Sequence, residues 1–293
     1  MMNSKTINLS SLLIYLFSIT QVAKRTILSE TLEYSPWSFS ELLISYPDQF
    51  IRRGLIGETI QIIAGDTVLF DTVNLFVFIN FVIFTLLSFT FIKLSKLSSI
   101  QHFLYLISIF GILNVSMFNQ YFHRKEMFVL NLFLIILLTL RFRANEYLIL
   151  IISSICSILM ILIHEGIAMI TIPFIVYLFK KMLDNSKKVL YVYTPIVLLI
   201  FLTVIISSGS DSSSNVIWEN LSEFDKNQIV INPNAITAIG WSLLDSFLNT
   251  TQILIFSGSM FLWTFYFFIV GFTLFVIFNI NLNKIYIDYS KVK

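Results

Sequence analysis

Residues 147–181 read YLILIISSICSILMILIHEGIAMITIPFIVYLFKK, a long apolar run that is interrupted once, by His164, Glu165 and Gly166. A helix that crosses a bilayer needs about 20 mainly apolar residues, and a charged side chain within one is costly. The three interrupting residues therefore fit the tip of a tight hairpin better than the middle of one long helix. The stretch predicts two neighbouring membrane helices, over 147–163 and 166–179.

The rest of the chain has the same character. Of its 293 residues, 57% are hydrophobic, 16% are aromatic and only 12% are charged, a composition typical of a polytopic membrane protein. We expect an all-α fold, a single transmembrane domain over 1–293 with about eight membrane helices. The apolar runs that predict these helices are 7–23, 72–92, 102–119, 127–140, 147–163, 166–179, 189–206 and 251–279.

Charge predicts the orientation. With both termini inside, the cytoplasmic segments hold twelve basic and three acidic residues, and the opposite face holds seven basic and fourteen acidic ones. An excess of Lys and Arg marks cytoplasmic loops. We therefore expect an N-in, C-in protein with two long outer loops, over 24–71 and 207–250.

The two outer loops differ in pattern. In 24–71 apolar residues recur at near-helical spacing, which predicts short interfacial helices that are broken at Pro36 and Pro47. The second loop opens with SSGSDSSSN at 207–215, which is typical of a flexible connection. Its acidic residues are expected to form a solvated face: Asp211, Glu219, Glu223 and Asp225.

Three polar motifs fall on the outer side. They are PDQFIRRGLIGE at 47–58, YFHRKEM at 121–127 and the hairpin tip HEG at 164–166. The spans 127–140 and 166–179 each cover only about 21 Å, at about 1.5 Å per residue, against a hydrocarbon core of about 30 Å. With their inner ends held at the cytoplasmic interface by basic residues, the motifs would end below the outer membrane surface. The pattern predicts a polar pocket in the outer leaflet.

The residue types in this pocket suit a phosphorylated lipid and a sugar hydroxyl. Guanidinium groups match phosphate oxygens, and several together suit a pyrophosphate. The candidate pyrophosphate-binding residues are Arg52, Arg53, Arg124, Lys125 and His123. Carboxylates and imidazoles can act as general acid or base on a hydroxyl, and the candidate catalytic residues are Asp48, Glu165, His164 and Glu126. For the hydroxyl-activating base we expect desolvation to raise the Glu165 pKa and a nearby Arg to lower it.

Simpler interpretations remain open for the same motifs. Arg52 and Arg53 can extend from an amphipathic helix to lipid headgroups. Residues 123–126 can form a solvated turn with internal ion pairs. Cys156 lies within an apolar run and is expected to be structural.

The FIRRG, RKE and HEG elements, together with an acidic residue ahead of an interfacial helix in the first outer loop, resemble parts of two groups of proteins. These are the multi-spanning GT-C type glycosyltransferases and the O-antigen and capsule polymerases of bacterial surface-polysaccharide clusters. The resemblance implies a multi-pass enzyme of the bacterial cytoplasmic membrane that builds surface polysaccharide from undecaprenyl-pyrophosphate-linked glycans. It also implies other polysaccharide-assembly proteins as partners, and it places the first-loop acid at Asp48, with Glu30 and Glu33 as rivals.

Two alternatives of another class are a polysaccharide or lipid transporter and a non-enzymatic membrane subunit. A transporter usually has broken or charged helices at mid-bilayer in repeated halves, and here only Pro173 and Pro195 interrupt the spans. A non-enzymatic subunit would not need clustered basic pairs on the outer face. The HEG motif lacks the second histidine of HExxH, and the chain has three histidines. We expect no metal site, no cofactor and no nucleic-acid partner, and a carboxylate-bound divalent metal stays open.

Overall fold

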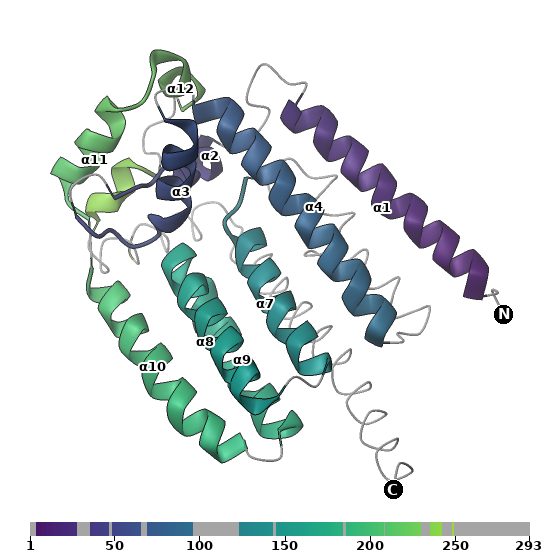
Figure 1. The fold of residues 1–293 in the computed structure, drawn as a ribbon. Helices are drawn as coiled ribbons and strands as arrows, with labels where there is room; N and C mark the ends of the chain where they lie inside the picture. The colour runs from purple at the N-terminus through teal and green to yellow at the C-terminus, as the bar shows by residue number, and fades with distance from the viewer. Residues whose placement is uncertain are drawn as a thin grey trace, which may run out of the picture. The chain divides into compact units, whose positions relative to one another are not determined.

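The computed structural model describes residues 4–27, 36–46, 49–65, 69–95, 123–142, 145–183, 186–207, 209–229, 235–241 and 248 (Figure 1). Within these ranges the chain is helical and contains no strand. The chain divides into two compact units. One consists of Met1–Ser18, Ile92–Phe118 and Ser242–Lys293, and the other of Ile19–Phe91 and Asn119–Trp241.

In the first unit, the described residues belong mainly to the larger part of one long helix and the end of another. Helix α1, Ser4–Ile27, begins there, and helix α4, Leu69–Ser95, ends there. Both helices cover runs that the sequence predicts as helical, 7–23 and 72–92. The predicted spans 102–119 and 251–279 lie outside the described residues.

The second unit contains a bundle of four helices that lie side by side in Figure 1. They are α7, Glu126–Arg141, α8, Glu146–Ile163, α9, Glu165–Met182, and α10, Ser186–Ile206. Helix α8 contacts each of the other three. The predicted helices at 127–140, 147–163, 166–179 and 189–206 are confirmed, with shifts of a few residues at their ends.

The hairpin predicted at 164–166 is confirmed, and one residue makes it. His164 has an extended backbone, with φ −159° and ψ 92°, and it separates α8 from α9. Its N–H donates to the carbonyl of Met160 at 2.8 Å and its carbonyl accepts the N–H of Ala168 at 3.1 Å. The same residue thus ends one helix and starts the next.

In the part of the chain that the structure describes, three helices are long and apolar enough to cross a membrane. They are Leu69–Leu94, Glu146–Ile163 and Val189–Ile206. Large apolar side chains on their outward faces are exposed, among them Ile151 and Leu199, as expected of faces that contact lipid. The total of about eight spans and the N-in, C-in orientation stay predictions.

Polar side chains link these apolar helices inside the bundle. The Asn131 amide of α7 donates to the side-chain oxygen of Asn80 on α4 at 2.7 Å and to its carbonyl at 3.0 Å. Ser157 of α8 and Tyr193 of α10 share a hydrogen bond of 2.6 Å. Hydrogen bonds of this kind between apolar helices help to hold the helices together.

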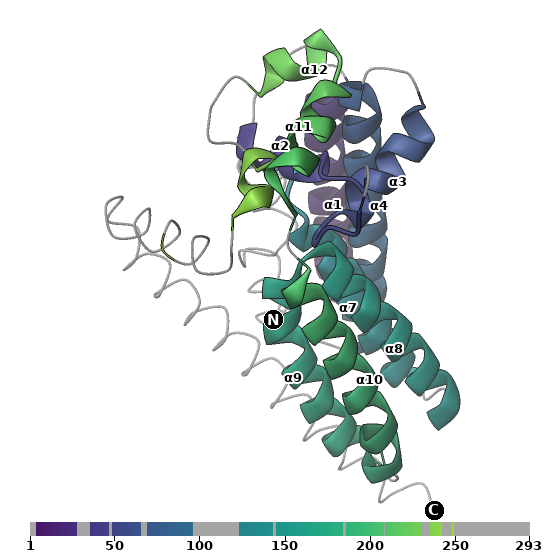
Figure 2. The ribbon, with the colours of Figure 1, turned by 90° about the vertical axis from the view of Figure 1, so that its left-hand side faces the viewer.

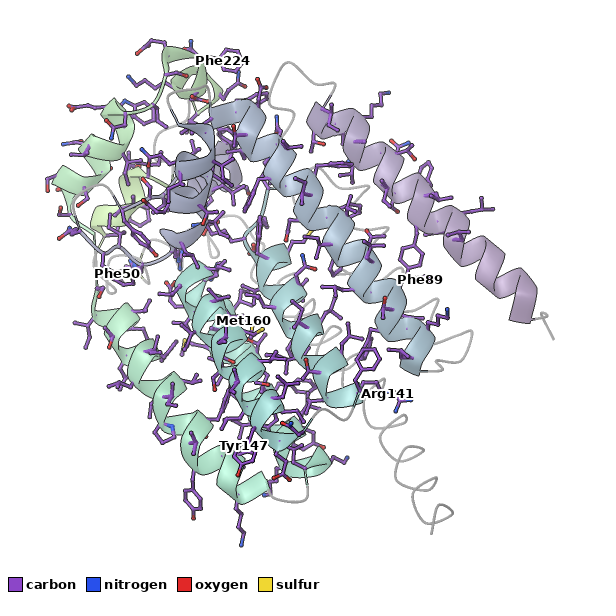
Figure 3. All side chains as sticks on the ribbon, viewed as in Figure 1. Phe50, Phe89, Arg141, Tyr147, Met160 and Phe224 are labelled. Atoms are coloured by element: carbon purple, nitrogen blue, oxygen red, sulfur yellow. The ribbon has the colours of Figure 1, made fainter. Side chains whose placement is uncertain are left out.

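Short helices gather at one end of the bundle (Figures 1 and 2). They are α2, Pro36–Leu42, α3, Leu55–Ala64, α11, Asp211–Glu219, α12, Glu223–Gln228, and the 3₁₀ helix η2, Thr237–Gly240. Figure 3 shows Phe224 of α12 at this end, and Arg141 and Tyr147 at the other end of the bundle. The predicted short helices of the first outer loop are therefore present, and Pro36 starts one of them.

The prediction for the second outer loop was wrong in two respects. The segment 207–215 is no plain flexible connection, because Ser210 accepts the N–H of Ser213 at 3.2 Å and starts α11. Serine is common in linkers, but it is also favoured as the residue that caps the start of a helix. Asp225 is fully buried and does not belong to a solvated face.

A candidate site of buried charges beneath the short helices

Five ionisable side chains meet where α2 and α3 lie over the start of α7 and the junction of α8 with α9. We call them the charged cluster: Glu41, Arg53, Lys125, His164 and Glu165. Glu41 comes from α2, Arg53 from the turn before α3, Lys125 from the residue before α7, and the last two from the hairpin tip. Four separate segments of sequence thus supply one site.

Arg53 lies at the centre of the cluster. Its Nε donates to both carboxylate oxygens of Glu165 at 3.0 Å, and its Nη2 lies 2.8 Å from Glu165 Oε1. Its Nη1 lies 3.5 Å from Glu41 Oε1. One guanidinium therefore joins carboxylates from two helices, in the fork geometry that makes such pairs strong and directional.

The turn that presents Arg53 is unusual. Arg53 has φ 66°, the one positive φ of a non-glycine residue in the described ranges. The N–H of Gly54 donates to the carbonyl of Ile51 at 3.3 Å, so Arg53 takes the turn position that glycine or asparagine normally occupies. A Cβ on Gly54 would lie 2.2 Å from the ring of Tyr46, which keeps the glycine at the next position. Strained residues of this kind persist where the surroundings hold them.

Lys125 lies beneath that turn. Its side chain is fully buried, and its Nζ donates to the main-chain carbonyl of Arg53. Burial lowers the pKa of Lys125 to about 8, against the attraction of Glu41 and the other carboxylates nearby. A fully buried lysine is rare unless its charge is paired. The hydrogen bond from Lys125 therefore links the start of α7 to the Arg53 turn.

Both carboxylates of the cluster are buried and ionised. Burial by itself would raise the pKa of Glu41, but attraction by His164, Lys125 and Arg53 outweighs it and lowers the pKa. Burial would also raise the pKa of Glu165, but the attraction and hydrogen bond of Arg53, together with the attraction of His164 and a backbone hydrogen bond, lower it. Of the opposite effects expected at Glu165 from the sequence, burial is the largest single one, but the combined effects that lower the pKa exceed it.

Two further ionisable residues form the edge of the cluster. Arg124 Nη1 lies 3.4 Å from Glu126 Oε1. The side chains of Arg53 and Arg124 are each 33% exposed, whereas those of Glu41 and Glu165 are 9% exposed. The arginines therefore face the outside and the carboxylates lie behind them.

Two polar atoms at this edge carry no hydrogen bond. Glu126 Oε2 and His164 Nδ1 are buried and have no partner among the described residues. His164 Nε2 lies 4.0 Å from Glu41 Oε1. Buried polar atoms are nearly always satisfied by protein, water or ligand, and these two are exceptions among the described residues.

Two predicted residues form hydrogen bonds outside the charged cluster, although the charge of Arg52 still interacts with Glu165 and Arg53. Arg52 donates from Nη2 to the main-chain carbonyl of Trp241 at 3.2 Å. His123 is fully buried, with its Nε2 2.8 Å from the Asn74 side-chain oxygen, and burial lowers its pKa to about 3. A neutral buried imidazole offers no charge to a phosphate, which argues against the predicted role of His123.

Sequence reasoning missed Glu41 and placed the first-loop acid elsewhere. The predicted Asp48 and its rivals Glu30 and Glu33 lie outside the described residues. The sequence did hold a signal for Glu41, because the carboxylate stands in WSFSELL, among apolar and small residues directly after Pro36. An acid in so apolar a helix needs a cationic partner.

The cluster can bind an anion at its exposed arginines and accept a proton at its carboxylates. In the described ranges, no group of three His, Cys, Asp or Glu side chains is arranged to hold a metal ion. No protein-family model, no curated protein and no solved structure matches this chain.

Proposed function

We propose that the protein is a membrane-embedded glycosyltransferase or polymerase of surface polysaccharide. It uses polyprenyl-pyrophosphate-linked sugars at the outer face of the bacterial cytoplasmic membrane. The observation that carries the proposal is the charged cluster, in which half-exposed arginines stand in front of buried carboxylates at one end of apolar helices.

The exposed arginines support a phosphorylated substrate. Arg53 and Arg124 each keep 33% of the side chain exposed, and guanidinium groups bind phosphate oxygens in pairs. A lipid substrate needs an apolar surface beside its phosphate site. Exposed apolar side chains near the cluster, such as Met169 on α9, one turn beyond Glu165, supply such a surface.

The carboxylates support hydroxyl activation. In glycosyl transfer the bond between the sugar and the pyrophosphate breaks, and the acceptor oxygen forms the new bond to the sugar. The acceptor hydroxyl proton goes to a base, for which Glu165 and Glu41 are the candidates, and the polyprenyl pyrophosphate leaves with the electron pair. When a phosphate takes over Arg53, the attraction that lowers the Glu165 pKa is weakened, and Glu165 becomes a stronger base.

One observation favours a second candidate, a non-enzymatic membrane subunit. Arg53 is already paired with Glu165 and Glu41, and Arg124 is paired with Glu126. A set of balanced ion pairs can serve only to join helices, with little net free energy. The transporter reading gains no such observation from the structure.

A deletion strain separates these candidates. We expect loss of the gene to remove or shorten the surface glycan and to accumulate its lipid-linked precursor. The wild type should restore the glycan, and Glu165→Gln or Glu41→Gln should not, although the protein accumulates in the membrane. Glu223→Gln is the matched control, because its side chain is 85% exposed. Full glycan with both cluster variants would reject the enzyme and favour the subunit.

A further inference from the structure

We propose that Lys125 is a positioning residue, which holds the Arg53 turn so that the guanidinium meets Glu165 and Glu41. It acts through the main-chain carbonyl of Arg53 and does not touch the substrate. The inference rests on the proposed function for what the charged cluster does, and it replaces the expectation that Lys125 binds pyrophosphate.

Exposure separates Lys125 from the phosphate-binding candidates. Its side chain is fully buried, whereas Arg53 and Arg124 are each 33% exposed. A phosphate that arrives from outside meets the two arginines first. The hydrogen-bond partner shown for the ammonium is the Arg53 carbonyl, so the lysine lies behind the turn and not in front of it.

The backbone of Arg53 explains why such support is needed. A side chain at φ 66° is disfavoured relative to glycine. Glu165 and Glu41 hold the far end of the same residue at the guanidinium, while Lys125 holds its main chain. Contacts from α2 and α9 thus hold the Arg53 guanidinium, and Lys125 at the start of α7 holds its main chain. Together they keep the bidentate guanidinium in one orientation.

Charges on every neighbouring segment face Lys125. They are Glu41 on α2, Arg53 in the turn, Glu165 on α9 and Glu126 at the start of α7 itself. With a pKa of about 8, the ammonium loses its proton within reach of ordinary buffers. Its hydrogen bond to the Arg53 carbonyl then weakens, because the ammonium charge is lost. The Arg53 guanidinium should therefore be held less firmly against Glu165 and Glu41 as the pH rises through about 8.

The first test follows the contact of the Arg53 guanidinium with Glu165 in the absence of substrate. The purified protein in detergent is labelled with ¹⁵N-arginine, and the Nε–H signal of Arg53 is assigned by its loss in Arg53→Lys. We expect this signal to be shifted by the Glu165 carboxylate in the wild type, to move with a midpoint near pH 8, and to broaden or disappear in Lys125→Met. Lys125→Arg keeps charge and donors and should retain the signal without the midpoint. An unchanged signal in Lys125→Met would overturn the inference.

The second test measures transfer in membrane vesicles, with the lipid-linked precursor that accumulates in the deletion strain as donor. A misplaced group of about 1 Å can cost roughly 100-fold in rate. We expect Lys125→Met to lower kcat at least tenfold and to change the KM for the donor less than threefold. A raised KM with an unchanged kcat would identify Lys125 as a phosphate ligand and reject positioning. If the wild type transfers nothing while the Arg53 signal behaves as expected, the proposed function fails and the role of Lys125 stands.

Discussion

The carboxylate of Asp225 accepts the main-chain N–H of Phe70, at 2.8 Å. It also accepts the N–H of Leu69 at 3.1 Å, and Ser222 donates its hydroxyl to the same carboxylate. Residues from α12 thus satisfy the free donors at the start of α4, where a negative charge also meets the helix dipole favourably. The fully buried aspartate fixes α12 to a long apolar helix.

This contact gives a stability prediction. Asp225→Ala should lower the free energy of unfolding by about 2 kcal/mol, because a cap and buried charge-assisted hydrogen bonds are lost together. Thermal unfolding in detergent measures the change. The neighbouring Glu223→Ala should stay within about 0.5 kcal/mol, since that side chain is exposed. Equal effects of the two substitutions would contradict the capping role.

The helices of the bundle could be predicted from the sequence for a physical reason. Apolar runs such as 147–163 have few alternatives to a helix in lipid, because every backbone polar group must be satisfied within the segment. His164 and Glu165 marked the hairpin because a charged pair is costly within a span. The start of α11 was missed because Ser210 belongs to a serine-rich segment, where composition indicates a linker and only position reveals a cap.

Part of the charged cluster could be predicted from the sequence. The outward basic pairs and the HEG tip pointed to Arg53, Arg124, Glu126 and Glu165, which the structure brings together. Glu41 was missed because its partners lie 12 and 123 residues further along the chain, at Arg53 and His164, and a contact across that distance leaves no local pattern. The contact of His123 with Asn74 left no local pattern for a similar reason, since Asn74 comes from another helix.

The pair of asparagines within the bundle gives a coupling prediction. Asn131→Ala and Asn80→Ala should each destabilise the protein, and the double variant should cost less than the sum. We expect a coupling of about 0.5–2 kcal/mol, the range for hydrogen bonds between membrane helices. A double-mutant cycle on thermal unfolding in detergent measures it. Thr90→Ala is the control for removing a polar group, because Thr90 bonds only within α4, to the carbonyl of Leu86. Strict additivity would remove the link between α4 and α7.

Orientation in the membrane is testable by reporter fusions. Because basic residues concentrate on the predicted cytoplasmic side, fusions after Ile63 and Ser222 should report an external position. A fusion after Arg143 should report an internal one. The first two sites belong to the two predicted outer loops, and the first of these supplies Glu41 and Arg53 of the charged cluster. An internal signal from both would place the cluster at the cytoplasmic face and remove the proposed outer-leaflet substrate.

The contact between α2 and α3 gives a packing prediction. A Cβ on Gly57 would lie 2.0 Å from the main-chain oxygen of Ile44, which cannot rotate away as a side chain can. Gly57→Ala should therefore cost about 1–3 kcal/mol, as overpacking usually does, and should displace α2 with Glu41. Thr59→Ala on the same helix changes no such contact and is the control. Thermal unfolding in detergent compares them, and equal stability of the two variants would show that the segments adapt freely.

The pairing of Arg53 with Glu165 and Glu41 predicts how stability depends on pH. In the wild type the pKa of both carboxylates lies below the ordinary value of 4.5, so their ionisation stabilises the fold at neutral pH. That contribution is lost only as the pH falls through the lowered pKa values. In Arg53→Met the attraction disappears while the burial remains, and the Glu165 pKa should rise instead. The variant should then be less stable than the wild type by about 3–5 kcal/mol at pH 7.

The sign of the pH effect separates this pair from an ordinary surface contact. As the pH falls towards 4, Arg53→Met gains stability by protonating its unpaired buried carboxylates and the wild type begins to lose stability. The gap in stability between the two proteins should therefore narrow.

Adding Glu165→Gln to Arg53→Met should recover part of the loss at pH 7, because the buried charge is removed with its partner. The pair of Lys226 with Glu223, at 2.9 Å on the surface, is the control, and Lys226→Met should cost less than about 1 kcal/mol. Unfolding temperatures in detergent at pH 8, 6 and 4 measure the gap. A gap that stays constant over this range would mean that the buried carboxylates of the charged cluster do not depend on Arg53 for their ionisation.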